Sequence, residues 1–421
     1  MEVGTPVALR RFLLLGAFLT PFNYVVAIPA GPITLHPLQV WAVLLVMLTL
    51  VRKPRTVLEA GDPPALLLWT MFAFVGVSTV LGTPDQFRVR GYLDAFLLAI
   101  NLAAFTLSYG HLRSDPAGWA PFARTLFGAS LLSSGFLVVR ALLVARSGMF
   151  VLPDSYMLGL GTVTGTFTAA LAAASVSGMT FAATRRLRVW MMVGIVLHGM
   201  AASLSLARGP WIAFAIGVAV TFVLMVRWLP TLSAVAGAIF RWAVALALLL
   251  SATVAVSLAN ATVGLLVASR AVQVTNLGSG TGRSRLSLFR ALLEDAMDSP
   301  VFGHGAAAYR QVSELLQVQG AISENFLLEM FHAGGAVAAV PLVLAAGIVT
   351  IRMTRSLGPP PHGAVPAACL AGVLALMLGS LTNPAAWDTG FWVLVATAAA
   401  LRPVVLPPNL STTQALEVTT R

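Results

Sequence analysis

Apolar runs about as long as a membrane-spanning helix recur along this chain, and they constrain its fold more than any other feature. A helix needs roughly 20 apolar residues to cross the hydrocarbon core of a bilayer. Runs of this kind lie near residues 12–30, 36–51, 64–81, 92–109, 122–145, 160–184, 188–205, 210–227, 241–260, 324–350, 364–382 and 388–402. The sequence therefore predicts an all-α polytopic membrane protein with about 12 transmembrane helices.

The composition agrees with a membrane protein and narrows its chemistry. Of the 421 residues, 58% are hydrophobic and 10% are charged, and the mean hydropathy is +0.88. A soluble helical protein would show amphipathic stripes, whereas these runs are apolar on every side. The net charge of +11 favours an anionic lipid or an anionic substrate, and there is no basic soluble region that would bind nucleic acid. The single cysteine, Cys369, excludes a disulfide within the chain.

Basic residues predict how the helices cross the inner (plasma) membrane, because arginine and lysine concentrate in short cytoplasmic loops. Alternate connections carry Arg10, Arg11, Arg52, Lys53, Arg55, Arg113, Arg185, Arg186, Arg188, Arg227, Arg352, Arg355 and Arg402. With 12 spans, these connections all face the cytoplasm, as do both termini. The 203–211 connection and the long 261–323 segment then face outward.

The chain divides into four parts on this basis. Residues 1–202 form an N-terminal transmembrane scaffold, residues 203–335 a core that includes the 261–323 loop, residues 336–402 the C-terminal helices, and residues 403–421 a short cytoplasmic tail. The outward loop contains a stretch with the pattern of an amphipathic helix lying on the membrane surface. The apolar positions on one of its faces are Leu286, Phe289, Leu293 and Met297.

Arginines and one carboxylate are the candidates for chemistry on the outward side. There is no pattern typical of a metal site, a Walker loop or a dinucleotide-binding loop, so we expect no metal ion and no cofactor. Arg208 lies in a very short connection, where a guanidinium can present its fork of donors to phosphate oxygens. Glu324 stands just before a span, where a carboxylate can accept a proton from an attacking hydroxyl.

Two ionisable residues lie deeper in the span that follows. Glu329 and His332 are three residues apart and therefore share a helical face. Charged groups inside a membrane are costly and are usually paired or functional. We expect these two side chains to pair with each other or with an arginine of another helix.

Three motifs in this region carry a resemblance to a known family. They are Ser205-Leu206-Ala207-Arg208-Gly209-Pro210-Trp211, then Gly282 to Phe289 with Pro300-Val301-Phe302-Gly303-His304-Gly305, and finally Glu324-Asn325-Phe326-Leu327-Leu328 with Gly334-Gly335. In this order they resemble the O-antigen ligase / O-antigen polymerase family, membrane glycosyltransferases of the GT-C type. Two positions depart from the family pattern: Phe289 stands at its tryptophan and Glu324 at its histidine.

The resemblance implies transfer of a glycan, without a metal ion, from an undecaprenyl-pyrophosphate-type carrier to an acceptor hydroxyl at the extracytoplasmic face. Its partners would be a lipid-linked oligosaccharide or polysaccharide donor and a glycan or lipid acceptor, in cell-surface polysaccharide synthesis. Arg208 and Arg285 would hold the pyrophosphate and stabilise its leaving charge. Glu324 would orient or deprotonate the acceptor. The further candidates for substrate binding are Arg283, Arg290, Asn325 and His304.

Several alternatives stay open at this point. Arg283 and Arg285 are both eligible for the loop arginine, and Arg285 fits better because it lies four residues before Phe289. The sequence does not distinguish a ligase from a polymerase. A transporter or flippase of lipid-linked glycans is the alternative from another class, although transporters usually show repeated halves, which this sequence lacks. An inert scaffold subunit would leave the arginines and the carboxylate without a role.

Overall fold

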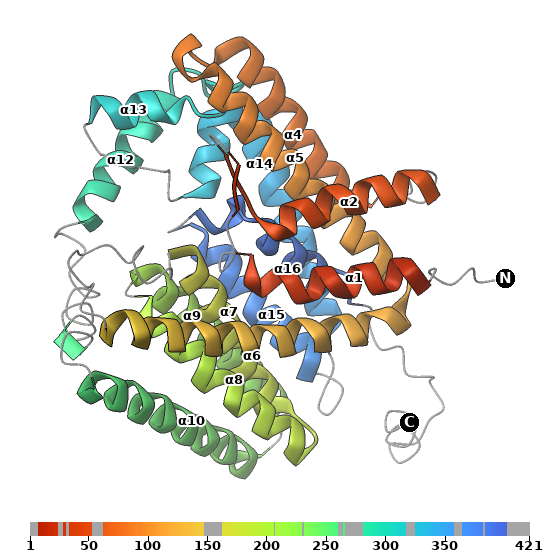
Figure 1. Cartoon of the computed structure of the whole chain (residues 1–421), viewed down its shortest axis with the longest axis vertical. Coiled ribbons are helices and arrows are strands. Elements are labelled where there is room, and N and C mark those ends of the chain that lie inside the picture. Colours follow the sequence, from red (N-terminus) through yellow and green to blue (C-terminus); the bar gives the residue numbers. More distant parts are fainter. Residues whose placement is uncertain are drawn as a thin grey trace.

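A computed structural model describes residues 7–23, 28–30, 33–52, 62–146, 162–205, 207–229, 231–259, 264–265, 281–316, 325–357, 364–381 and 384–401. This part of the chain is almost entirely helical (Figure 1). Its elements are α1 (Val7–Leu19), η1 (Thr20–Phe22), β1 (Ile28–Ala30), β2 (Ile33–Leu35), α2 (Pro37–Arg52), α4 (Pro63–Gly82), α5 (Asp85–Ser114), α6 (Pro116–Arg146), α7 (Thr162–Phe181), α8 (Arg185–Leu204), α9 (Arg208–Trp228), α10 (Leu232–Ala259), α12 (Thr281–Ala296), α13 (Tyr309–Leu315), α14 (Phe326–Arg355), α15 (Ala364–Gly379), η3 (Pro384–Trp387) and α16 (Thr389–Ala399). The two short strands pair antiparallel, with Ile28 opposite Leu35.

The predicted all-α polytopic membrane fold is confirmed, and each of the predicted apolar runs contains a helix. The predicted number of about 12 spans refers to the whole chain, and the described residues allow a count by helix length and apolarity. In the described residues, 7 helices are long and apolar enough to cross a membrane: α4, α5, α6, α8, α9, α10 and α14. The remaining runs fall short of the expectation because α1, α2, α15 and α16 are short, while α7 is rich in threonine, serine and glycine.

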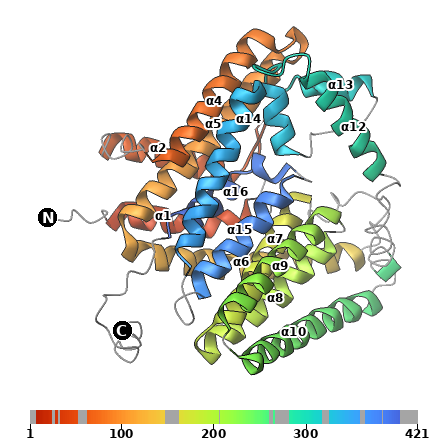
Figure 2. The same cartoon turned by 180° about the vertical axis from the view of Figure 1, so that it is seen from behind.

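Helix α7 lies at the centre of one group of helices, where it contacts α8, α9 and α15 (Figures 1 and 2). Small residues line these contacts and let the helix axes approach closely. A side chain at Gly217 of α9 would overlap Ala173 of α7, and a Cβ at Gly372 of α15 would lie 3.0 Å from the Ala174 Cβ. Close packing of small residues therefore holds this group together.

Helices α4, α5 and α14 form the second group, on the far side of α16 from α8 and α10 (Figures 1 and 2). α14 packs along α4, and α5 packs along α16, where the rings of Phe105 and Trp392 meet edge to face with centroids 6.1 Å apart. α12 and α13 lie beside the N-terminal part of α14, away from the rest of the bundle (Figure 2). Helix α12, from the loop predicted to face outward, is thus attached to the α14 group.

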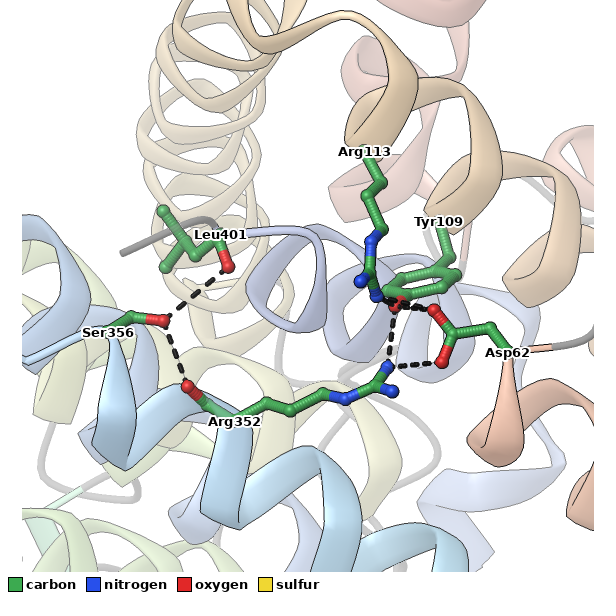
Figure 3. A network of polar contacts seen from close by, with 6 residues as sticks. All are labelled: Asp62, Tyr109, Arg113, Arg352, Ser356 and Leu401. Carbon is green, nitrogen blue, oxygen red and sulfur yellow. Dashed lines mark hydrogen bonds and ion pairs between the residues drawn. The ribbon is translucent and has the colours of Figure 1, made fainter. Parts of the chain in front are cut away.

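A polar network joins three helices at the opposite end of α14 (Figure 3). Arg352 Nη1 lies 2.5 Å from Asp62 Oδ1 and donates to the Tyr109 hydroxyl oxygen at 2.7 Å. Arg113 also bonds to the Asp62 carboxylate. Ser356, which follows the last residue of α14, donates from Oγ to the Arg352 carbonyl at 2.9 Å. Arg113 and Arg352, which the sequence assigned to the same side of the membrane, therefore meet at one end of the molecule.

Candidate functional site

The α8–α9 turn carries the first motif. Ser205 ends α8 with its hydroxyl donating to the Ala202 carbonyl at 2.6 Å, and Arg208 is the first residue of α9. The Arg208 side chain lies outside what the structure describes. Ala207, the N-cap residue, provides no side-chain acceptor for the first N–H groups of α9. This uncapped helix N-terminus favours an anionic group beside it.

The N-terminal ends of α9 and α14 lie close together because the end of α15 bridges them. A Cβ at Gly379, the last residue of α15, would lie 3.0 Å from Ala213 of α9 and 2.9 Å from Thr166 of α7. The next residue, Ser380, accepts a backbone hydrogen bond from Phe326, the first residue of α14, at 3.3 Å. The structure thus brings together two of the three motif segments.

Asn325 caps α14. Its side-chain oxygen accepts a hydrogen bond from the backbone N–H of Leu328 at 3.0 Å, a regular N-cap interaction. Glu324 precedes it directly but lies outside the described residues. The predicted proton acceptor therefore belongs to the segment that enters α14, while the described role of Asn325 is to begin the helix.

Helix α12, which carries the first part of the second motif, packs against the first turns of α14. Leu288 and Leu292 are buried on its inner face and cluster with Tyr309 and Val312, with Leu328 of α14 packed against them. Arg283 and Arg285 lie near the N-terminal end of α12, and their side chains are not described. We call the convergence of the N-terminal ends of α9 and α14, the C-terminal end of α15, and α12 the helix-end site.

The predicted amphipathic face of α12 is not the face that packs on the protein. Of the four predicted positions, Leu286, Leu293 and Met297 are between 49% and 59% exposed and Phe289 is partly exposed, whereas Leu288 and Leu292 are buried. α12 is therefore apolar on two sides, one of which contacts α13 and α14. The exposed side is the one that the sequence predicted to lie on the membrane surface, and the described parts of the protein leave it uncovered.

The loop after α12 fills a break in α14. Gly335 interrupts the helix with φ of 64° and ψ of −162°. His304 and Gly305 donate backbone hydrogen bonds to the carbonyls of His332 and Ala333, both at 2.8 Å. On the other side of the break, the Ala336 N–H donates to the Pro300 carbonyl at 2.8 Å. The loop thus satisfies polar backbone groups that the break would leave unpaired inside the protein.

Glycine is required on both sides of this contact. Gly303 and Gly305 have φ of 67° and 90°, backbone conformations that residues with a side chain rarely adopt. A Cβ at Gly303 would lie 2.6 Å from the Ala333 carbonyl carbon, and one at Gly335 would overlap the Val301 backbone. The glycines of two separate motifs therefore serve one close backbone contact.

Asp295 joins α12 to α14 through a histidine pair. Its carboxylate oxygen Oδ2 lies 2.7 Å from His332 Nε2, and its backbone carbonyl lies 2.9 Å from His304 Nε2. Because both oxygens only accept, each histidine must carry a proton on Nε2. The two rings pack with centroids 5.2 Å apart. The predicted substrate-binding residue His304 is thus part of an interaction that fixes α12.

The expected partners of Glu329 and His332 were wrong. Glu329 is 3% exposed and accepts a hydrogen bond from Trp387 Nε1 at 2.8 Å, while His332 bonds to Asp295. Tertiary packing places the η3 indole, an uncharged donor, nearest to the buried carboxylate. Arg310 and Asp94 act on Glu329 only through longer-range electrostatic interactions.

The described polar side chains of α12 and α13 differ in burial. Arg290 is exposed and pairs with Glu294 at 2.8 Å, an interaction that raises the pKa of the guanidinium. Tyr309 is buried, and burial raises the pKa of its hydroxyl above the ordinary value. Its neighbour Arg310 lies with its guanidinium carbon 5.6 Å from the Tyr309 ring centroid. Arg290, predicted to bind substrate, therefore contacts a carboxylate of its own helix.

Residues 193–343 match the family model described as O-antigen ligase. The matched segment covers less than half of the chain. It contains all three motifs, so the resemblance to the O-antigen ligase / O-antigen polymerase family is confirmed. No curated protein matches the chain. The match supports a function of the O-antigen ligase/polymerase type, and the several apolar helices are those of a multi-pass membrane protein.

Sequence reasoning about the O-antigen ligase segment missed Asp295, Trp387 and Asp94. Asp94 is 6% exposed within an apolar helix, where Arg90 pairs with it at 2.9 Å. A carboxylate in an apolar run can be recognised from the sequence alone as a residue that is paired or functional. Asp295 and Trp387 offer no such signal, because an acidic residue in a polar loop and a tryptophan near a helix end are both ordinary.

Proposed function

We propose that this chain transfers a glycan from an undecaprenyl-pyrophosphate-type carrier to an acceptor hydroxyl at the extracytoplasmic face of the membrane. The convergence of α9, α12 and α14 at the helix-end site carries the proposal. Arg208 and Arg285 belong to α9 and α12, Glu324 precedes α14 in the sequence, and all three residues lie within the matched segment 193–343.

The proposed chemistry begins with the pyrophosphate. Its oxygens accept hydrogen bonds from the guanidinium groups of Arg208 and Arg285 and from the uncapped first turn of α9. When the bond between the sugar and the pyrophosphate breaks, negative charge grows on the leaving oxygen. Arginines already in place stabilise that charge, which lowers the barrier to transfer.

The acceptor provides the other half of the reaction. Its hydroxyl oxygen forms the new bond to the anomeric carbon, and Glu324 takes the hydroxyl proton as the general base. The segment entering α14 is suited to this role, because Asn325 and the Phe326–Ser380 hydrogen bond hold the start of the helix. The exposed apolar side of α12 can rest on the membrane that holds the lipid tail of the donor.

A flippase or transporter of lipid-linked glycans is the second candidate, and the break in α14 favours it. Interrupted helices are common in transporters, where they line the substrate path. Here the loop at residues 300–305 covers the break with backbone hydrogen bonds. The break consequently serves to seat a loop, which supports the transferase over the transporter.

The test uses a host strain that lacks the gene, complemented with wild type, Arg208→Ala or Glu324→Gln. Gels of surface glycan and carrier-linked glycan are compared. We expect both variants to lower transfer by a factor of about 100 or more, as loss of a charge-stabilising group or a general base does. Arg227→Ala is the matched control, because Arg227 lies in the last turn of the same helix, far from the helix-end site.

The product that accumulates identifies the reaction. Full-length chains held on the lipid carrier indicate a ligase, and single repeat units indicate a polymerase. Full transfer by Arg208→Ala at normal expression would contradict the proposal. Repeat units trapped on the cytoplasmic side of the membrane would favour the flippase.

A further inference from the structure

The middle of the chain contains many arginines and no acidic residue. Residues 155–293 include neither aspartate nor glutamate. Their arginines are Arg185, Arg186, Arg188, Arg208, Arg227, Arg241, Arg270, Arg283, Arg285 and Arg290. Helices α7 to α10 all lie in this region, so no carboxylate from these helices can neutralise an arginine between them.

Arg188 and Arg241 lie on two of these helices that pack together. Arg188 lies in the first turn of α8, and Arg241 lies in α10, which packs along α8 at the edge of the molecule (Figures 1 and 2). The two guanidinium groups interact as like charges. Each has a buried Nε with no hydrogen-bond partner among the described residues. A buried donor without a partner is costly, and a neighbouring like charge adds to that cost.

The Arg241 side chain bends toward the N-terminal end of α10. Its Nη1 lies 3.6 Å from the position that a Cβ would take at Gly237, one turn earlier in the helix. Long basic side chains in membrane helices turn in this way to bring their charge to the lipid headgroups. The absence of a side chain at Gly237 leaves room for the guanidinium.

Tryptophans mark the same end of the helices as the membrane interface. Trp242, beside Arg241, donates from Nε1 to Thr180 Oγ1 of α7 at 2.8 Å. Trp228, at the end of α9, packs edge to face on Phe181, and Trp190 of α8 is 49% exposed. Tryptophan is enriched where membrane helices meet the headgroups. The arginine pair therefore lies at headgroup depth.

Most of helix α10 is exposed outside its contact with α8. Only 6% of its most apolar stretch is buried inside the protein. Large side chains such as Phe240 and Leu250 are exposed on this helix. A ligand for the two arginines can therefore approach from the membrane along the α8–α10 edge. Arginine pairs suit phosphate, since each guanidinium presents two parallel N–H donors to its oxygens.

We propose that Arg188 and Arg241 form a binding site for a phosphate group at the α8–α10 edge. A phosphate satisfies the unpartnered donors and cancels the repulsion between the two charges. The group can come from the headgroup of an anionic phospholipid or from free phosphate. This site is separate from the helix-end site, and it stands whether or not the chain transfers glycans.

The experiment measures thermal unfolding of the purified full-length protein in a neutral detergent. Phosphatidylglycerol, phosphatidylcholine or inorganic phosphate is added in separate series. We expect phosphatidylglycerol to raise the midpoint of unfolding and phosphatidylcholine to leave it unchanged. Arg188→Gln and Arg241→Gln should each weaken the apparent affinity by about tenfold, the effect of losing one charged hydrogen-bond donor.

Matched controls separate this site from general surface charge. Arg186→Gln removes an exposed arginine from the same turn of α8 and should keep the wild-type response. Arg188→Lys and Arg241→Lys retain the charge without the fork, so they should bind more weakly than wild type even if the glutamine variants fail to fold. An equal effect of inorganic phosphate supports the site with free phosphate as its source.

Two results would overturn the proposal. One is an identical response of the wild-type protein to phosphatidylglycerol, phosphatidylcholine and buffer without phosphate. The other is an equal loss of response in Arg186→Gln and Arg188→Gln, which would assign the effect to total charge.

Discussion

At the scale of single residues, Asp295 is the side chain on which the placement of α12 depends most. It is the only described carboxylate that contacts His332, and its own carbonyl bonds to His304. His332 is 1% exposed, and the Asp295 carboxylate is the described acceptor for its Nε2–H. The contact holds the C-terminal end of α12 against α14.

Asp295→Ala should lower the free energy of unfolding by about 1–3 kcal/mol, the usual cost of leaving a buried donor without its partner. Asp295→Asn should retain most of the stability, because an amide oxygen can accept the same hydrogen bond. Thermal unfolding in detergent measures both. Glu294→Ala is the control, since Glu294 pairs only on the surface with Arg290. An alanine variant as stable as the asparagine variant would show that the Asp295–His332 bond contributes nothing.

At the scale of elements, the break in α14 is the feature that joins the loop to the membrane helices. It needs a left-handed backbone at Gly335 and two more at Gly303 and Gly305. Such conformations are strained for any residue with a side chain. The pairing of the loop with the two halves of α14 therefore depends on glycine at these positions.

In Gly335→Ala, the backbone conformation alone should cost about 1–3 kcal/mol of stability. The total loss should be larger, because the new Cβ also overlaps the Val301 backbone. Gly347→Ala in the same helix is the control. A Cβ at Gly347 meets nothing within 4 Å, so this change should be neutral or slightly stabilising. Equal unfolding midpoints for the two variants would contradict the strained contact.

At the scale of the whole molecule, the two ends of α14 belong to different polar systems. Its N-terminal turns contact α12, α13 and η3, and its C-terminal turn joins Asp62, Tyr109 and Arg113 (Figure 3). A helix of 30 residues is long enough to separate these systems by a full bilayer. The predicted orientation places the first of them outside the cell.

Cysteine labelling checks this orientation. The native Cys369 is first replaced by alanine, and single cysteines then replace Glu314 in α13 or Ser114 at the end of α5, both of which are exposed. In cells stripped to the plasma membrane, an impermeant maleimide should label Glu314→Cys directly. Ser114→Cys should react only after the membrane is opened. Labelling of both from the same side would mean that the helix-end site and the Asp62 network do not lie on opposite faces.

Much of the architecture follows from local sequence properties. Length and apolarity are enough to predict the helices, because an apolar run in a bilayer must satisfy its own backbone hydrogen bonds. The glycines of the 303–305 turn were also predictable, since only glycine adopts such backbone angles readily. The motif order pointed to the O-antigen ligase family before any contact was known.

Partners were decided by the tertiary structure. Glu329 bonds to Trp387, 58 residues away, and His332 bonds to Asp295, 37 residues away. Helical periodicity reports which side chains share a face of one helix, and it carries no information on what packs against that face. The sequence by itself thus determined the membrane fold and the family segment. Only packing decided that a loop seats in a broken helix, because the choice among distant donors and acceptors depends on the approach of elements in space.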